Sequence, residues 1–248
     1  MEGSVQPGGV GQGSPVLSPT STGQTSAFER FRTTLIYDAI TRLPLVLWFA
    51  ICAWGMGHRL YADFMAADTV DAKLVLDLLA RATGMAFVLI VILALSLRRP
   101  AVARSAGILP RLVAFAGTFS LTPLALLAPV SQSLFVSAVS LILVCVGYIF
   151  ACYTLLHLGR SLSMMAEARK LVISGPYAFV RHPLYTAEAI ASLGLLLQYL
   201  TLPAVALWVF HIALQLTRIQ YEETILSKTF PDYKNYAKRV PRLLPGVY

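Results

Sequence analysis

The chain has 248 residues, of which 57% are hydrophobic and only 13% are charged. A soluble domain carries about 25% charged residues, so this composition excludes an ordinary soluble protein and predicts a polytopic membrane protein. The net charge of +8 comes from Lys and Arg in short loops between apolar stretches. That distribution is typical of cytoplasmic loops and argues against a nucleic-acid partner.

Residues 1–27 are rich in Gly, Ser, Pro and Thr and contain almost no large apolar side chains. Such a segment cannot bury enough surface to fold, so we predict a disordered N-terminal tail. It has neither the basic start nor the apolar run of a signal peptide.

Six apolar stretches follow, at residues 43–60, 82–97, 109–128, 134–158, 184–200 and 203–217. Basic residues gather before the first stretch and after the second, fourth and sixth, whereas the opposite loops are mixed or uncharged. Since basic loops stay in the cytoplasm, we expect six transmembrane helices and both termini in the cytoplasm. The predicted fold is all-α: residues 28–158 hold the first four helices, and residues 159–248 hold a C-terminal helical hairpin.

Residues 61–80 alternate apolar and charged side chains at roughly helical spacing. This segment is either an amphipathic helix on the membrane surface or a structured loop. Cys52, Cys145 and Cys152 lie in predicted spans without metal-type or disulfide spacing, and we expect small buried side chains there. His58, His157 and His211 are predicted to be interfacial or packed, and no metal site is expected.

Two polar clusters flank the hairpin. The first is the stretch from Ser174 to Tyr185, where Arg181 and His182 stand between two prolines. The second is Arg218 with Glu222 and Glu223. Because a hairpin returns to the side where it began, we expect the two clusters to meet, and polar groups beside lipid indicate a functional site.

The residue types in these clusters suit an adenosine that carries an amino-acid tail. Carboxylates can hold an amine or ribose hydroxyls, and aromatic rings can pack against a purine. The sequence has no glycine-rich phosphate cradle following a strand. Glu188, one helical turn after Leu184, faces either this site or the membrane interface.

Several separated motifs in residues 159–248 resemble the isoprenylcysteine carboxyl methyltransferases and the related phospholipid methyltransferases. They are Lys170–Tyr177, Arg181–Tyr185, Arg218 with Glu222–Glu223, Phe230–Tyr236 and Arg239–Pro241. The resemblance implies an integral membrane methyltransferase that uses S-adenosylmethionine at the cytoplasmic face. Its acceptor would be lipophilic and would enter from the bilayer, so membrane lipids are the expected surroundings.

The resemblance also implies which residues form the site. Arg218 matches the arginine that faces the acceptor, and we assign it the catalytic role. The predicted cofactor-binding residues are Arg169, Lys170, Leu171, Val172, Tyr177, His182, Pro183, Leu184, Tyr185, Glu222 and Glu223. At Arg169 and Lys170 the chain departs from the His-Thr common in the isoprenylcysteine enzymes, so these two contacts are expected to use the backbone.

Three acceptors stay open: a prenylated cysteine carboxylate, a phospholipid amine and a small thiol. A carboxylate needs no general base and would be oriented by Arg218, whereas an amine must lose a proton, which a nearby Glu could take. Two rival functions also remain: a nicotinamide-dependent membrane sterol reductase, which would need extra basic residues for phosphates, and a non-catalytic scaffold or transporter.

Overall fold

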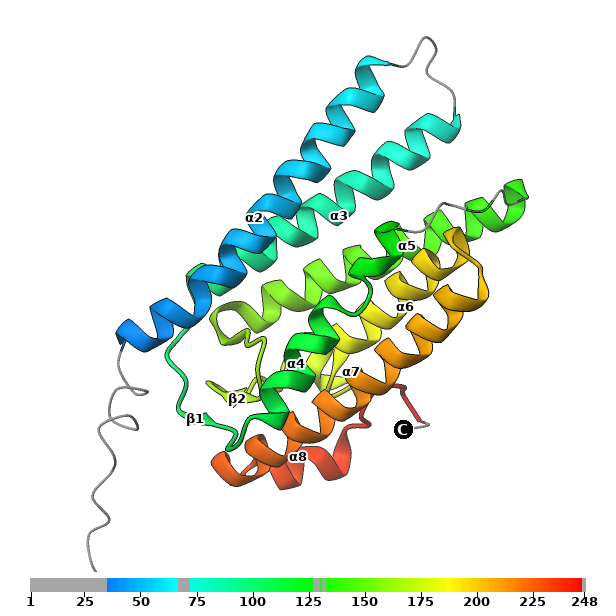
Figure 1. Cartoon of the computed structure of the whole chain (residues 1–248). Helices are drawn as coiled ribbons and strands as arrows, with labels where there is room; N and C mark the ends of the chain where they lie inside the picture. The colour runs from blue at the N-terminus through cyan, green and yellow to red at the C-terminus, as the bar shows by residue number, and fades with distance from the viewer. Residues whose placement is uncertain (1–34, 67–71, 127–129, 131–132, 247–248) are drawn as a thin grey trace, which may run out of the picture.

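The computed structural model describes residues 35–66, 72–126, 130 and 133–246. The predicted disordered tail lies outside these residues. The described part is mostly helical, and its long helices run alternately up and down, so that the start of α6 and the end of α7 lie at the same end of the molecule (Figure 1).

The helices are α2 (Leu35–Met65), α3 (Ala72–Ser96), α4 (Leu109–Phe119), α5 (Leu134–Leu158), α6 (Pro183–Gln198), α7 (Leu202–Thr229) and α8 (Tyr233–Arg239). Three 3-10 turns join them: η1 (Thr122–Leu126), η2 (Gly159–Ser161) and η3 (Gly175–Ala178). The all-α prediction missed one feature, a pair of two-residue antiparallel strands, β1 (Ala103–Arg104) and β2 (Glu167–Ala168).

Four helices of the described chain are long and apolar enough to cross a membrane: Arg42–Met65, Leu78–Ser96, Leu134–Ser161 and Leu202–Thr229. These helices have the composition of an integral membrane protein. The other two predicted spans are short: α6 has 16 residues, and the third stretch breaks between α4 and η1, where Pro123 cannot donate a backbone hydrogen bond. Six spans and cytoplasmic termini therefore stay predictions.

The ambiguous segment 61–80 takes neither of the two expected forms. Residues 61–65 continue α2, and α3 begins at Ala72, so the charged and apolar residues are the facing ends of two long helices. An ion pair between Arg81 and Asp63 joins the helices there. Residues 67–71 lie outside the described residues. The three cysteines are free thiols of intermediate burial on α2 and α5, rather than fully buried.

Small residues let α5 and α6 pack closely. A Cβ atom added to Gly147 would lie 2.5 Å from the backbone nitrogen of Ala191, and one added to Gly194 would lie 2.8 Å from the carbonyl oxygen of Ser140. The Ser140 hydroxyl donates to the Gly194 carbonyl at 2.7 Å. Close backbone approach through small residues is a common way for membrane helices to associate, and here it fixes α6 beneath the site.

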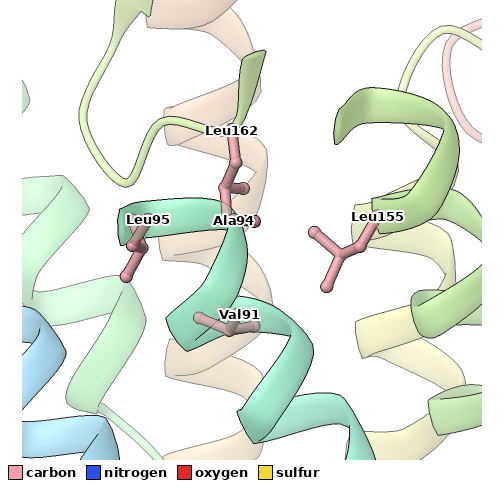
Figure 2. Close-up of a cluster of buried hydrophobic side chains, with 5 residues drawn as sticks. All are labelled: Val91, Ala94, Leu95, Leu155 and Leu162. Carbon is pink, nitrogen blue, oxygen red and sulfur yellow. The ribbon is translucent and has the colours of Figure 1, made fainter. Parts of the chain in front are cut away.

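A buried cluster joins α3 and α5 to the loop that follows α5 (Figure 2); its members are Val91, Ala94, Leu95, Leu155 and Leu162. The loop then pairs with β1: the amides of Val102 and Ser105 donate to the carbonyls of Ala168 and Ala166. Apolar packing and backbone pairing thus hold residues 162–168 against the helices, and these residues lead directly into the predicted site.

Candidate active site

Local sequence explains how the hairpin of α6 and α7 forms. α6 begins at Pro183, as predicted, because proline suits the first helical turn and His182 before it has non-helical angles (φ −127, ψ 58). The Thr201 hydroxyl caps α7 by accepting from the Ala204 amide at 3.4 Å. α7 has 28 residues, so its second half returns past the start of α6.

A glycine turn brings the first polar cluster against α5. Gly175 has φ +62, and a Cβ atom there would lie only 2.2 Å from Cδ2 of His157. Only glycine tolerates both the left-handed backbone and this contact. The turn η3 is therefore held at the end of α5, with Tyr177 buried beneath it.

The hairpin encloses a cavity of about 370 Å³, within the range typical of small-molecule sites. Ten predicted site residues line it: Arg169, Lys170, Leu171, Val172, Tyr177, His182, Leu184, Tyr185, Arg218 and Glu222. Pro183 and Glu223 do not line it. The two sequence clusters are thus brought together around one space, as the hairpin argument expected.

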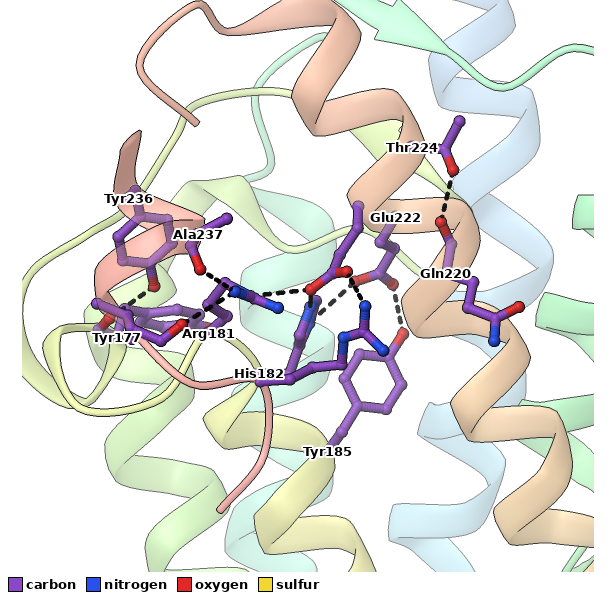
Figure 3. Close-up of polar contacts among 12 residues, drawn as sticks. Tyr177, Arg181, His182, Tyr185, Gln220, Glu222, Thr224, Tyr236 and Ala237 are labelled. Carbon is purple, nitrogen blue, oxygen red and sulfur yellow. Dashed lines mark hydrogen bonds and ion pairs between the residues drawn. The ribbon is translucent and has the colours of Figure 1, made fainter. Parts of the chain in front are cut away.

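Glu222 faces this cavity with few partners. The Tyr185 hydroxyl donates to Oε1 of Glu222, and Nδ1 of His182 lies 3.9 Å from Oε2. Figure 3 shows Tyr185 of α6, and His182 just before this helix, pointing toward Glu222 on α7. This carboxylate is held in place by one hydroxyl but keeps acceptor capacity for a ligand, since an ionised carboxylate has about four lone-pair sites.

Glu223 has a different environment, which we call the Glu223 clamp: Arg181, His182, Glu223 and Arg242. Its oxygens accept from Nε of Arg181 at 2.9 Å, Nε2 of His182 at 3.2 Å and Nη2 of Arg242 at 2.7 Å. The Arg181 and Glu223 side chains are only 12% and 15% exposed. Glu223 is therefore committed to protein contacts, so its predicted role as a cofactor ligand is not supported by its position.

The C-terminal segment closes the site through the backbone. The amides of Arg181 and His182 donate to the carbonyls of Pro241 and Arg242 at 2.8 and 3.1 Å. The Tyr236 hydroxyl donates to the Tyr177 carbonyl at 2.6 Å, and burial raises the pKa of Tyr236 to about 12, so it stays a proton donor at neutral pH. The sequence motif at Phe230–Tyr236 thus holds the turn at Tyr177 in place.

Tyr233 is a buried residue beside the Glu223 clamp. It is 4% exposed and lines the cavity. Burial and the neighbouring Glu223 carboxylate, which its hydroxyl faces, both raise the pKa of Tyr233. Tyr233 therefore stays neutral and supports the clamp at the edge of the cavity.

Deeper in the cavity lies a set of residues that we call the Arg218 network: Glu188, Gln215 and Arg218. Nη1 of Arg218 donates to Oε1 of Gln215 at 2.9 Å, and Nε2 of Gln215 donates to Oε2 of Glu188 at 2.8 Å. Nη2 of Arg218 also donates to the Met164 carbonyl at 3.2 Å. Its guanidinium lies over the Tyr185 ring, 5.3 Å from the centroid.

Sequence reasoning missed part of this inner region. Gln215 was not predicted, although it lies one turn before Arg218 on the same helix face. His211, expected to be packed or interfacial, is buried, shares a 2.7 Å hydrogen bond with Ser120 and also lines the cavity. Glu188 faces the cavity, which settles the alternative left open above. Glu188, His211 and Gln215 share one sequence signal that could have identified them: each is a polar residue inside an apolar stretch.

The described residues contain no group of three or more His, Cys, Asp or Glu side chains that could hold a metal ion. The polar and aromatic groups that line the cavity include arginines, carboxylates, histidines and tyrosines.

Comparison with known proteins agrees with the sequence motifs. Residues 140–228, which contain most of the cavity-lining part of α5, α6 and α7, match the isoprenylcysteine carboxyl methyltransferase (ICMT) family model. This region of the chain is ICMT-like. The predicted resemblance to the ICMT family is confirmed for residues up to 228, and the motifs at Phe230–Tyr236 and Arg239–Pro241 lie beyond the matched range.

A plant relative carries the same family name. The chain is 32% identical over 125 residues to protein-S-isoprenylcysteine O-methyltransferase B of Arabidopsis thaliana, which is 47% of this chain and 62% of the relative. The chain is thus similar both to the ICMT family model and to a plant protein that carries the isoprenylcysteine methyltransferase name.

Two bacterial relatives have other names. The nickel-cobalt-cadmium resistance protein NccN of Alcaligenes xylosoxydans xylosoxydans is 34% identical over 83 residues. The cobalt-zinc-cadmium resistance protein CzcN of Cupriavidus metallidurans is 37% identical over 78 residues. The matches span 38% and 36% of these relatives, and 33% and 31% of this chain.

Proposed function

We propose that the protein is an integral membrane methyltransferase that uses S-adenosylmethionine to methylate a lipophilic acceptor. The observation that carries the proposal is that Tyr185 and Glu222, from two separate motifs of the ICMT-like region, meet at the wall of one cavity. A scaffold or transporter would not need these groups together.

The cavity residues fit the methyl donor. Glu222 offers a carboxylate with open acceptor sites for an ammonium or for ribose hydroxyls, and the rings of Tyr177, His182 and Tyr185 line the space around it. When bound, the donor supplies a methyl group activated by the positive charge of its sulfur.

The chain's own residues then have separate tasks. Tyr185 holds Glu222 by its hydroxyl and presents its ring to Arg218. The Glu223 clamp and the C-terminal segment hold Arg181 and His182 in place beside the cavity. Arg218 orients the polar end of the acceptor, because only two of its five N–H groups are used by Gln215 and Met164. Alignment of two reactants in a dry site is a large part of such catalysis.

The opposite wall of the cavity is apolar. Phe49, Phe87 and Val91 of α2 and α3 line it together with Leu121 and Leu195. An apolar wall made by membrane helices suits an acceptor that enters from the bilayer, while the donor enters from the cytoplasmic rim. The plant relative's name indicates an isoprenylated cysteine carboxylate as acceptor; a phospholipid amine and a thiol are the alternatives.

A nicotinamide-dependent reductase is the second enzyme class to consider, and the described arginines disfavour it. Its cofactor would need cations for phosphates, but Arg169 is bound to Glu167 at 2.6 Å and Arg181 to Glu223 at 2.9 Å. Both cations are already neutralised by protein carboxylates.

Calorimetric binding of S-adenosylhomocysteine to the detergent-purified protein tests the proposal. We expect binding to the parent protein, loss in Glu222→Ala, and no change in Thr217→Val, whose exposed hydroxyl bonds only to its own helix. A folded parent that binds NADPH but not S-adenosylhomocysteine would rule the methyltransferase out.

A further inference from the structure

Gln215 is a buried amide on α7 to which the proposed function gives no task. It is 7% exposed, and it lies one helical turn before Arg218, which is 8% exposed. Its amide nitrogen donates to Oε2 of Glu188 on α6 at 2.8 Å, and its carbonyl oxygen accepts from Nη1 of Arg218 at 2.9 Å. A buried amide with hydrogen bonds at both ends fixes the position of each partner relative to the other.

The chemistry of the two partners allows only one orientation of the Gln215 amide. An ionised carboxylate only accepts hydrogen bonds, and a guanidinium only donates them. The amide nitrogen must therefore face Glu188, and the oxygen must face Arg218. Without an acceptor at Glu188 the amide would be free to turn over and point its N–H groups at the guanidinium. Glu188 thus sets the direction of Gln215, and Gln215 sets the position of Arg218.

The other contacts of Arg218 also restrict its position. Nη2 donates to the Met164 carbonyl at 3.2 Å, and the guanidinium lies 5.3 Å from the centroid of the Tyr185 ring. On α4, a Cβ atom added to Gly117 would lie 2.8 Å from Cδ of Arg218, so the side chain has no room to retract toward that helix. A guanidinium has five N–H groups. Two are used by the protein, which leaves three for a ligand in the cavity.

Arg218 differs from the other two arginines that line the cavity in how it meets its nearest carboxylate. Arg169 and Arg181 are paired directly with Glu167 and Glu223, at 2.6 and 2.9 Å. Within the described residues no ion pair joins Arg218 to a carboxylate, because the neutral amide of Gln215 stands between it and Glu188. A carboxylate in direct contact would occupy the N–H groups that an anionic ligand needs. The amide instead holds the guanidinium without neutralising it.

We infer that Gln215 is a positioning residue for the acceptor: held in direction by Glu188, it aims the guanidinium of Arg218 at the substrate's carboxylate. This inference rests on the proposed methyltransferase function and on its carboxylate acceptor. A guanidinium binds a carboxylate through two parallel hydrogen bonds, which fix the plane of the carboxylate as well as its place. Since a carboxylate has no proton to lose, Glu188 is not needed as a base and acts through Gln215.

Equilibrium binding separates this role from turnover and from folding. The detergent-purified protein is saturated with S-adenosylhomocysteine and titrated calorimetrically with a farnesylated cysteine or with its carboxamide, which has the same tail but no charge. The ratio of the two dissociation constants reports recognition of the carboxylate alone. It is measured for the parent, Gln215→Met, Glu188→Met and Glu188→Gln. Thr217→Val is the control on α7, because Thr217 does not line the cavity.

We expect the parent to bind the acid more tightly than the carboxamide. Gln215→Met keeps the length of the side chain and should reduce that preference by about 10- to 100-fold, as loss of a hydrogen bond to a charged group does. Affinity for the carboxamide and for S-adenosylhomocysteine should stay within a few fold of the parent. A side chain that only filled space would change the affinity for both ligands alike.

The two changes at Glu188 test how it acts. Glu188→Met should lose part of the preference for the acid, because Gln215 is then free to turn over. Glu188→Gln should recover most of that loss, since the new carbonyl still accepts from Gln215. Equal losses in the two variants would overturn the role given to Glu188.

A parent that binds S-adenosylhomocysteine but shows no preference for the acid, or binds neither ligand, would overturn the inference. So would a Gln215→Met variant that keeps the parental preference. A folded parent that does not bind S-adenosylhomocysteine would instead overturn the proposed function, and this titration comes before either acceptor ligand is added. The two failures are therefore distinguishable.

Discussion

Glu222 and Glu223 are neighbours on α7 but have different surroundings: Glu223 belongs to the clamp with Arg181, His182 and Arg242. Glu222 belongs to a cavity wall that also contains the Arg218 network. In the clamp, Glu223 receives three hydrogen bonds, from Arg181, His182 and Arg242, so most of its acceptor capacity goes to the protein. In the wall, Glu222 has a single hydrogen-bond donor among the described residues, Tyr185. The contrast separates the two carboxylates of one sequence motif into one that is bound by the protein and one that faces the cavity.

The largest expected effect comes from breaking the clamp. Glu223→Ala leaves two arginines and His182 without their shared partner, and removal of one partner from a buried ion pair costs about 3–5 kcal/mol. The unfolding temperature in detergent should fall sharply. If Glu223→Ala keeps the parental unfolding temperature but loses S-adenosylhomocysteine binding, Glu223 is a ligand and the division between the two carboxylates is wrong.

The matched change on the wall should affect binding rather than stability. Glu222→Gln removes a negative charge that makes few contacts within the protein. A hydrogen bond from a ligand to such a charged group contributes about 1.5–3 kcal/mol. The dissociation constant of S-adenosylhomocysteine should therefore rise by roughly 10- to 100-fold, with the unfolding temperature within a few degrees of the parent. A large loss of stability without a change in affinity would contradict this assignment.

Crowding Arg218 from α4 sharpens the comparison without changing any charge. In Gly117→Ala the new Cβ would lie 2.8 Å from Cδ of Arg218 and 3.1 Å from Oε1 of Gln215, and such overpacking costs about 1–3 kcal/mol. Methyl transfer should fall while S-adenosylhomocysteine binding persists, because the proposed donor site is at Glu222 and the crowded atoms belong to Arg218 and Gln215. Unchanged transfer would mean that the position of Arg218 is not critical.

The smallest expected effect concerns the hydrogen bond between Tyr236 and Tyr177. Tyr236→Phe deletes the 2.6 Å hydrogen bond to the Tyr177 carbonyl, worth about 1 kcal/mol, and should lower the unfolding temperature slightly. Since the pKa of Tyr236 is raised to about 12 by burial, the parental bond should be insensitive to pH between neutrality and about pH 10. The unfolding temperature is measured for parent and variant between neutrality and about pH 10. A difference between the two proteins that changes with pH in this range would contradict the raised pKa of Tyr236.

The hairpin and the meeting of its two polar clusters could be predicted from sequence, because an antiparallel return must bring Pro183 and Arg218 to one side. The division between Glu222 and Glu223 could not, since neighbouring helical residues differ only by a rotation of about 100°. The deciding partner, Arg242, comes from the C-terminal segment, whose path no local pattern sets. Gln215 was missed because an isolated amide in an apolar helix has no distinctive spacing.

The break between α4 and η1 was also missed. Hydropathy over residues 109–128 reads as continuous, but Pro123 interrupts the backbone hydrogen bonding, and Ser120 turns back to bond the Gly117 carbonyl at 3.2 Å. The short α4 places Gly117 and Ser120 beside Arg218 and His211, so the break contributes to the inner cavity.

An experimental structure of the full chain with S-adenosylhomocysteine bound would test the central claim most directly. We expect the ligand in the cavity, in contact with the Glu222 carboxylate, with Arg181, His182 and Arg242 still bound to Glu223. A ligand bound outside this cavity, or one held by Glu223 after the clamp has opened, would contradict the account.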